Sequence, residues 1–133
     1  MGATLKLVDE TAHGAPLGGF ELELRLVSER MTVRELLKRR VRAEVERYNA
    51  TQPEVFSGLV APTDAQQVQN GYRLEARRQL DWEAQLEQAC RAFQSNGFLL
   101  LIDDSQLEAL DDEVVLTPNC DVRFVKLVPL VGG

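Results

Sequence analysis

Hydrophobic and polar residues alternate most regularly near the start of the chain. Every second residue from position 20 to 26 is apolar, and the residues between them are charged. This period of two predicts a β-strand with one buried and one solvated face. A second strand is predicted at 4–9, where Leu5 and Leu7 share a face. Because residues 11–19 between them are rich in glycine and also hold Pro16, the two strands should form an antiparallel hairpin.

The pattern then changes to the period of a helix. Thr32 and Glu35 form a capping-box motif, in which each side chain can accept a hydrogen bond from the other residue's backbone amide. Apolar residues follow at helical spacing as far as Tyr48. These features predict an amphipathic helix over about 32–49, packed on the sheet. Its basic outer side is interpreted as solvated surface rather than a nucleic-acid site.

Residues 50–79 show no clear period, because prolines and glycines interrupt them; a helical turn is predicted only at 66–70. A second helix is expected from about 81 to 94. Asp81 should cap its start, and Gly97 should provide a left-handed cap after its end. The apolar side of this helix predicts core positions for Trp82, Leu86, Cys90 and Phe93.

Three further strands are predicted in the last third of the chain. The apolar run 98–102 ends in Asp103-Asp104, which indicates a buried strand followed by a turn. A short strand at 114–116 precedes a turn at Pro118-Asn119, and 122–128 forms the last strand. Leu107 and Leu110 are expected to be buried anchors in an irregular segment. The chain is therefore predicted to be α+β, with a mixed sheet of about four to five strands.

Composition and charge narrow the possible functions. The chain has 133 residues, 44% of them hydrophobic and 27% charged, which suits one soluble globular domain. No apolar run is long enough for a membrane span, and the N-terminus lacks a signal-peptide pattern, so we expect a cytoplasmic protein with no membrane partner. The net charge of −6 argues against nucleic acid as the main partner. Charge is uneven, with +3 over 32–49 and −7 over 103–121.

No arrangement of residues indicates that the chain is itself an enzyme. His13 is the single histidine, so neither a Ser/His/Asp nor a Cys/His pair is expected, and His13 is interpreted as an exposed loop residue. Cys90 and Cys120 are too few for a zinc site and are not expected to form a disulfide. The chain has no P-loop motif. We expect no cofactor and no catalytic or metal-binding residues.

The last residues carry the most specific signal. The final strand is followed by Pro129-Leu130-Val131-Gly132-Gly133. Earlier in the chain, the stretch Leu110–Val114 forms an acidic turn that leads into a strand. This ending resembles the small sulfur carriers of molybdopterin and thiazole biosynthesis. The order hairpin, helix, further strands and diglycine resembles the ubiquitin-like β-grasp family. We therefore expect one β-grasp domain over 1–128, with an insertion at about 50–97, and an exposed diglycine tail at 129–133.

The resemblance implies a function for this tail. Gly133 would be adenylated on its carboxylate by an E1-like adenylating enzyme, which would itself use the ATP. In a protein modifier, conjugation to target proteins would follow, with an E2-like conjugating enzyme and an isopeptidase as further partners. Gly132 and Gly133 would be the activated residues, and Pro129, Leu130 and Val131 would bind the partner. The alternatives are a sulfur carrier with a C-terminal thiocarboxylate and a noncovalent β-grasp interaction module.

Residue chemistry agrees with a tail that enters a partner's active site. Glycine has no Cβ and permits the closest approach of backbone to a nucleotide. Pro129 fixes its own φ and biases Val128 towards an extended conformation.

The long middle segment, at about 50–97, departs from a typical sulfur carrier or ubiquitin. It favours the modifier slightly, because a sulfur shuttle needs little additional surface.

Overall fold

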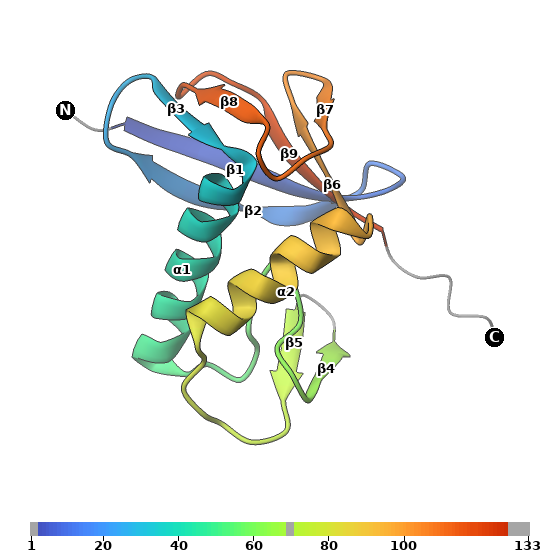
Figure 1. The fold of residues 1–133 in the computed structure, drawn as a ribbon. Coiled ribbons are helices and arrows are strands. Elements are labelled where there is room, and N and C mark those ends of the chain that lie inside the picture. Colours follow the sequence, from blue (N-terminus) through green and yellow to red (C-terminus); the bar gives the residue numbers. More distant parts are fainter. Residues whose placement is uncertain (1–2, 69–70, 128–133) are drawn as a thin grey trace. The chain divides into compact units, whose positions relative to one another are not determined.

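The computed structural model describes residues 3–68 and 71–127, which divide into two compact units (Figure 1). The sheet unit contains the chain up to Val33 and again from Phe93, and the helix unit contains Arg34–Ala92. The described residues form an α+β structure with a mixed five-stranded sheet and two helices, as the sequence predicts. The helix unit begins earlier in the chain than the insertion expected at 50–97.

The sheet unit is organised around a five-stranded sheet of order β2-β1-β9-β6-β7. Its strands are β1 (Ala3–Thr11), β2 (Pro16–Leu24), β6 (Phe98–Ile102), β7 (Ser105–Leu107) and β9 (Val122–Lys126). Strands β1 and β9 are parallel, whereas every other neighbouring pair in this sheet is antiparallel. The first and last strands of the unit are therefore adjacent at the centre of the sheet, with a hairpin on either side.

The alternation seen in the sequence produces the core of the sheet unit. Leu5 and Leu7 of β1 are fully buried, as are Val122 and Phe124 of β9. The rings of Phe98 and Phe124 are 5.9 Å apart between centroids, so aromatic side chains connect β6 to β9 inside this core. The predicted hairpin β1–β2 is confirmed.

The expected inward position of Leu26 is wrong. Strand β2 ends at Leu24, and Leu26 lies in the following bend with 59% of its surface exposed. The chain turns there because Glu29 accepts a hydrogen bond from the backbone amide of Arg25 at 2.6 Å, which closes a short loop. The alternation of apolar and charged residues continues to Leu26 in the sequence, but the strand itself ends at Leu24.

The predicted turn at Asp103-Asp104 is confirmed, and its geometry explains a strand that the sequence did not reveal. Both aspartates have positive φ, 50° and 67°, as the two central residues of a tight β-hairpin turn require. The chain therefore reverses immediately into β7, which pairs with β6. Leu110 is buried as expected, whereas Leu107 is half-buried within β7.

A separate two-stranded ribbon lies in the sheet unit beside the start of the first helix (Figure 1). It consists of β3 (Glu29–Thr32), which was not predicted, and β8 (Glu113–Leu116), which matches the strand predicted at 114–116. The backbone amide of Val33, the first helical residue, donates to the carbonyl of Asp112 at 2.9 Å. An amide that helix geometry leaves unpaired is thus satisfied by the segment that leads into β8.

Helix α1 (Val33–Thr51) begins and ends within two residues of its predicted bounds. Its apolar positions are buried as the 3.6-residue period requires; they are Val33, Leu36, Leu37, Val41, Val45 and Tyr48. Within the helix unit, the ring of Tyr48 packs edge-on against Phe56, with 5.5 Å between centroids. Asn49 then accepts from the amide of Leu80 at 2.8 Å and donates to its carbonyl at 2.9 Å.

The helical turn predicted at 66–70 is wrong. Residues 66–68 of that segment lie in β4 (Ala65–Val68), which pairs as a hairpin with β5 (Gly71–Leu74). Gly71 has a φ of +152°, and a Cβ there would lie 2.5 Å from the carbonyl oxygen of Phe56. Phe56 exchanges two backbone hydrogen bonds with Tyr72 across this contact, at 2.7 and 2.9 Å. Besides its hairpin partner β4, strand β5 therefore pairs with Phe56, which lies outside the hairpin and which the local sequence pattern does not reveal.

Helix α2 (Trp82–Gln94) follows the predicted bounds, and Asp81 caps it by accepting from the amide of Glu83 at 3.1 Å. Two expectations about this helix are wrong. The left-handed residue after its end is Asn96, with a φ of +61°, and not Gly97; asparagine tolerates this conformation. Trp82 and Leu86 are only half-buried, whereas Cys90 and Phe93 are buried as expected.

The helix unit buries a charged pair. Arg40 and Glu44 lie one turn apart on α1, and their side chains are 2% and 3% exposed. The Arg40 Nε donates to one carboxylate oxygen of Glu44 at 3.0 Å, and the amide of Leu59 donates to the other at 3.3 Å. The pair therefore fixes the segment around Leu59 against the inner side of α1 within this unit.

Candidate functional site

Strand β9 positions the segment that carries the predicted site. It lies between β1 and β6, and hydrogen bonds to both neighbours hold its backbone from Val122 to Lys126. Because Val122 and Phe124 point into the core, the strand is anchored by side chains as well as by backbone. The last strand of the described residues thus lies inside the sheet and not at an edge.

The last contact of this strand in the described residues is made by Leu127. Its amide donates to the carbonyl of Gly97 at 3.2 Å, just before β6 begins, and 36% of its surface is exposed. The predicted site residues Pro129, Leu130, Val131, Gly132 and Gly133 lie outside the described residues, as does Val128. Their roles in activation and partner binding remain predictions.

The sheet presents a second face beside this strand, opposite the core. One row across it joins Val8, Arg123 and Leu101, and the next row joins Glu10, Val125 and Leu99. These side chains alternate with the core residues of the same strands, and all but Val125 are half-exposed. We call these six residues the outer face. It is aliphatic, with one acid and one base at its centre.

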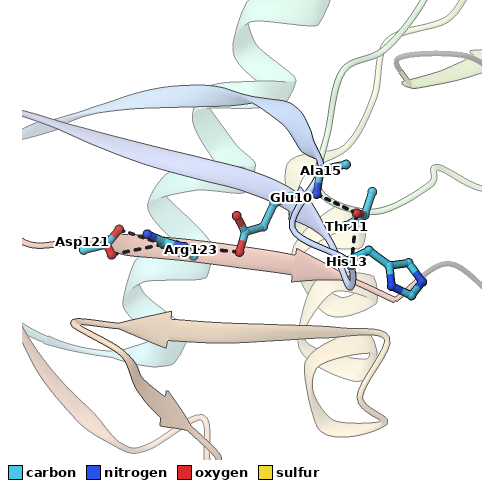
Figure 2. Close-up of polar contacts among 6 residues, drawn as sticks. All are labelled: Glu10, Thr11, His13, Ala15, Asp121 and Arg123. Atoms are coloured by element: carbon cyan, nitrogen blue, oxygen red, sulfur yellow. Dashed lines mark hydrogen bonds and ion pairs between the residues drawn. The ribbon is translucent and has the colours of Figure 1, made fainter.

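The base of the outer face is held by two carboxylates. The Nε of Arg123 lies 3.1 Å from each carboxylate oxygen of Asp121, and its Nη1 lies 3.7 Å from Glu10 Oε1 (Figure 2). The hydrogen bonds and charge of Asp121, with the charge of Glu10, raise the pKa of Arg123. The guanidinium is therefore neutralised from both sides, so this face does not present a free cation to an acidic ligand.

Asp121 is itself fixed by the neighbouring hairpin. Its amide donates to Asp103 Oδ1 at 2.8 Å, and its carbonyl accepts from the amide of Asp103 at the same distance. The β6–β7 turn therefore supports the contact between Asp121 and Arg123. Sequence analysis did not single out Arg123, although its position between Val122 and Phe124 places it on the face opposite the core.

The β1–β2 turn contains the single histidine of the chain. Thr11 Oγ1 accepts from the amides of His13 and Ala15, at 3.3 and 3.1 Å, and so closes the turn (Figure 2). The imidazole of His13 points away from the Arg123 contacts, and the residue is exposed. This agrees with the loop position expected for His13.

Cys90 has the buried position that the sequence predicts. Both cysteines are free thiols; Cys90 is buried and Cys120 is half-buried. Burial raises the pKa of Cys90, and the positive charge of Arg34 opposes that change only in part. A thiol whose pKa is raised is a poor nucleophile at neutral pH. Cys90 therefore has the properties of a small buried apolar residue.

The described parts of the chain contain neither a metal-binding group of side chains nor a helix suited to a membrane. No group of three or more His, Cys, Asp or Glu side chains in residues 3–68 and 71–127 has the arrangement needed to hold a metal ion. Neither of the helices described here has the length and apolar character that crossing a membrane requires.

Comparison with known proteins adds no relative. The chain matches no protein-family model, no curated protein and no solved structure.

Proposed function

We propose that the chain is a ubiquitin-like β-grasp protein modifier, activated at the carboxylate of Gly133 and conjugated to target proteins. The observation that carries this proposal is the order of the sheet. An N-terminal hairpin, a following helix and a last strand beside the first, parallel to it at the sheet centre, are compatible with a β-grasp fold and support the proposal. The strand parallel to β1 is also the strand that leads into the Pro129–Gly133 segment.

The anchoring of β9 supports a role for this segment as a presented substrate. Leu127 is held to Gly97, so the residues that follow begin from a fixed point on the sheet unit. Six residues at about 3.3 Å each would reach about 20 Å when extended, which is enough to enter a partner's active-site channel. Gly132 and Gly133 lack side chains that would obstruct a narrow channel.

The proposed chemistry has two steps. The first takes place in the E1-like adenylating enzyme, and the second takes place there or after transfer from it. A carboxylate oxygen of Gly133 attacks the α-phosphorus of ATP, forming the acyl adenylate and releasing pyrophosphate. A nucleophile then attacks the Gly133 carbonyl, displaces AMP and loses its proton. A target amine, reached directly or through thioesters, gives an amide; a sulfur donor would instead lead to a thiocarboxylate. The sulfur-carrier alternative therefore shares the first step.

ATP–pyrophosphate exchange tests the first step. The protein, prepared with Gly133 as its carboxyl terminus, is incubated with an E1-like adenylating enzyme from the same source. We expect exchange that depends on the protein. A variant lacking Gly133 and a variant with one residue added after Gly133 should both abolish it, because neither presents the same carboxylate. An Arg77→Ala variant, altered at an exposed position of the helix unit, serves as the control that retains exchange.

The masses of the reaction products distinguish a protein modifier from a sulfur carrier. A mass increase corresponding to a covalent adduct on a second protein would support the modifier, and replacement of a carboxylate oxygen by sulfur would establish the sulfur carrier. The C-terminal peptide of the protein from its native source should end at Gly133. Exchange that is absent, or that is indifferent to the loss of Gly133, would overturn the proposal and favour a noncovalent interaction module.

A further inference from the structure

The helix unit carries a row of basic residues on one side of α1. Arg34, Lys38 and Arg42 are four residues apart, so they lie along one side of the helix about 6 Å from each other. Arg34 and Arg42 are exposed, and Lys38 is half-exposed. Arg42 also pairs with Glu46 at 3.0 Å, while within the described residues Lys38 has no carboxylate partner. We call these three residues the basic row.

Helix α2 meets the basic row at its first residue. The indole of Trp82 has the Lys38 ammonium 5.8 Å and the Arg42 guanidinium 5.1 Å from its ring centroid. Leu86 follows one turn later on the same side of α2 and is half-buried. An apolar patch of Trp82 and Leu86 therefore begins beside the Lys38 and Arg42 end of the basic row.

The indole prepares this surface for binding. Two cations over one ring are attracted to its π face, which restricts the long side chains of Lys38 and Arg42 before any ligand arrives. Side chains that are already restricted lose less conformational entropy when a partner immobilises them. Because Trp82 remains half-buried and not enclosed, it can also contact an apolar group of that partner.

The charge of the rest of the molecule limits what this surface can attract. The sheet unit holds five bases and twelve acids, a net charge of −7, whereas the helix unit holds ten bases and nine acids. A nucleic-acid strand carries charge along its whole length and would be repelled by the acidic unit. A short peptide places its charge locally. Carboxylates four residues apart on a helix are also about 6 Å from each other, which matches the basic row.

We propose that the basic row, with Trp82 and Leu86, binds an acidic peptide segment of a partner protein. Carboxylates of the segment pair with Arg34, Lys38 and Arg42, and an apolar side chain packs on Trp82 and Leu86. This interaction goes beyond the proposed function, because it uses the helix unit and does not involve Gly133.

Binding can be observed directly, because Trp82 is the only tryptophan of the chain. The probe is a synthetic peptide of about twelve residues with glutamate at every fourth position and leucine beside it. We expect the peptide to change Trp82 fluorescence, and a matched peptide with glutamine in place of glutamate to change it at least about tenfold more weakly. Anisotropy of the fluorescein-labelled peptide then gives affinities that do not depend on the indole.

Matched variants distinguish peptide binding at the basic row from general electrostatic attraction to the protein. Lys38→Glu should weaken peptide binding about tenfold, which corresponds to about 1.4 kcal/mol. Arg77→Glu makes the same change of charge at an exposed position of the same unit and should alter binding less than about twofold. Circular dichroism confirms that both variants are folded. Equal weakening by the two variants, or no binding of the glutamate peptide, would overturn the proposal.

Two other occupants would also overturn it. A single-stranded oligonucleotide that binds more tightly than the glutamate peptide, and loses affinity in Lys38→Glu, would make the surface a nucleic-acid site. Sedimentation of the protein alone that shows a dimer dependent on Lys38 would make the occupant a second copy of this chain.

Discussion

The sheet unit and the helix unit use different interactions to stabilise their interiors. Four polar or charged side chains are buried in the described residues, and three of them, Arg40, Glu44 and Gln85, belong to the helix unit. The interior of the sheet unit is formed by aliphatic and phenylalanine side chains, with Asp9 as its buried polar residue. In the sheet unit the buried backbone is satisfied through strand pairs, and side chains accept from amides at exposed turns. In the helix unit side chains also satisfy buried or part-buried backbone groups.

Irregular backbone in the helix unit explains this difference. Between β5 and α2, and between α1 and β4, the helix unit contains irregular backbone outside its strands and helices, although Phe56 bridges to Tyr72 of β5. Buried amides and carbonyls there still need partners, because an unpaired buried group costs about 1–3 kcal/mol. Glu44 supplies an acceptor to Leu59, Gln85 donates to the carbonyl of Val60 at 3.3 Å, and Asn49 pairs with Leu80. Single polar substitutions should therefore harm this unit most.

The largest expected effect is at Glu44. Glu44→Ala removes the carboxylate that pairs with the Arg40 guanidinium, which is 2% exposed, and the acceptor of the Leu59 amide. We expect a loss of about 3–5 kcal/mol in the free energy of unfolding, because the buried positive charge loses its paired carboxylate. Urea unfolding monitored by the fluorescence of Trp82, in the same unit, measures it.

A double variant completes this test. Arg40→Met combined with Glu44→Leu removes both charges and retains volume, so its free energy of unfolding should exceed that of Glu44→Ala by at least about 2 kcal/mol. If Glu44→Ala loses less than about 1 kcal/mol, the buried pair does not stabilise the helix unit in the way described.

In the sheet unit an apolar truncation should have a comparable effect. Phe124 is fully buried and contacts Phe98, so Phe124→Ala should cost about 3–5 kcal/mol through lost burial and the cavity that it leaves. Far-UV circular dichroism during urea unfolding provides the measurement. Val115→Ala, at a position of β8 that is 47% exposed, is the control and should change stability by about 0.5 kcal/mol or less. Similar losses in both variants would show that Phe124 is not a core anchor.

A smaller effect is expected at the start of α2. Asp81→Ala removes the acceptor for the Glu83 amide and should cost about 1 kcal/mol. Asp81→Asn should retain most of that stability, because asparagine is also a good N-cap residue. Thermal unfolding of the two variants, with Glu75→Ala at an exposed bend as control, tests the cap. A loss in Asp81→Asn equal to that in Asp81→Ala would indicate an effect of charge and not of capping.

The two proposals depend on different units and can fail separately. Activation at Gly133 depends on the strand order of the sheet unit and on the segment after Leu127. Binding of an acidic peptide depends on α1 and α2 within the helix unit. Lys38→Glu should therefore leave ATP–pyrophosphate exchange unchanged, unless the adenylating enzyme itself supplies the acidic segment.

The sequence by itself determined those features that depend on near neighbours. The period of β2, the bounds of α1 and α2, the Asp81 cap and the Asp103-Asp104 turn all follow from residues within about four positions of each other. The last strand was also predicted, at 122–128 after a Pro-Asn turn, and the structure has it at Val122–Lys126. Its continuation to the diglycine motif, from which the function is proposed, is likewise a local feature.

Only the tertiary structure decided which distant segments pair. The place of β9 at the centre of the sheet depends on β1, more than a hundred residues earlier in the chain. Strand β3 depends on β8, and Gly71 adopts its conformation beside the backbone of Phe56. The burial of Arg40 and the contacts of Trp82 depend in the same way on packing between separate segments. Local periodicity contains no information about such partners, because it describes one segment and its faces but not what covers them.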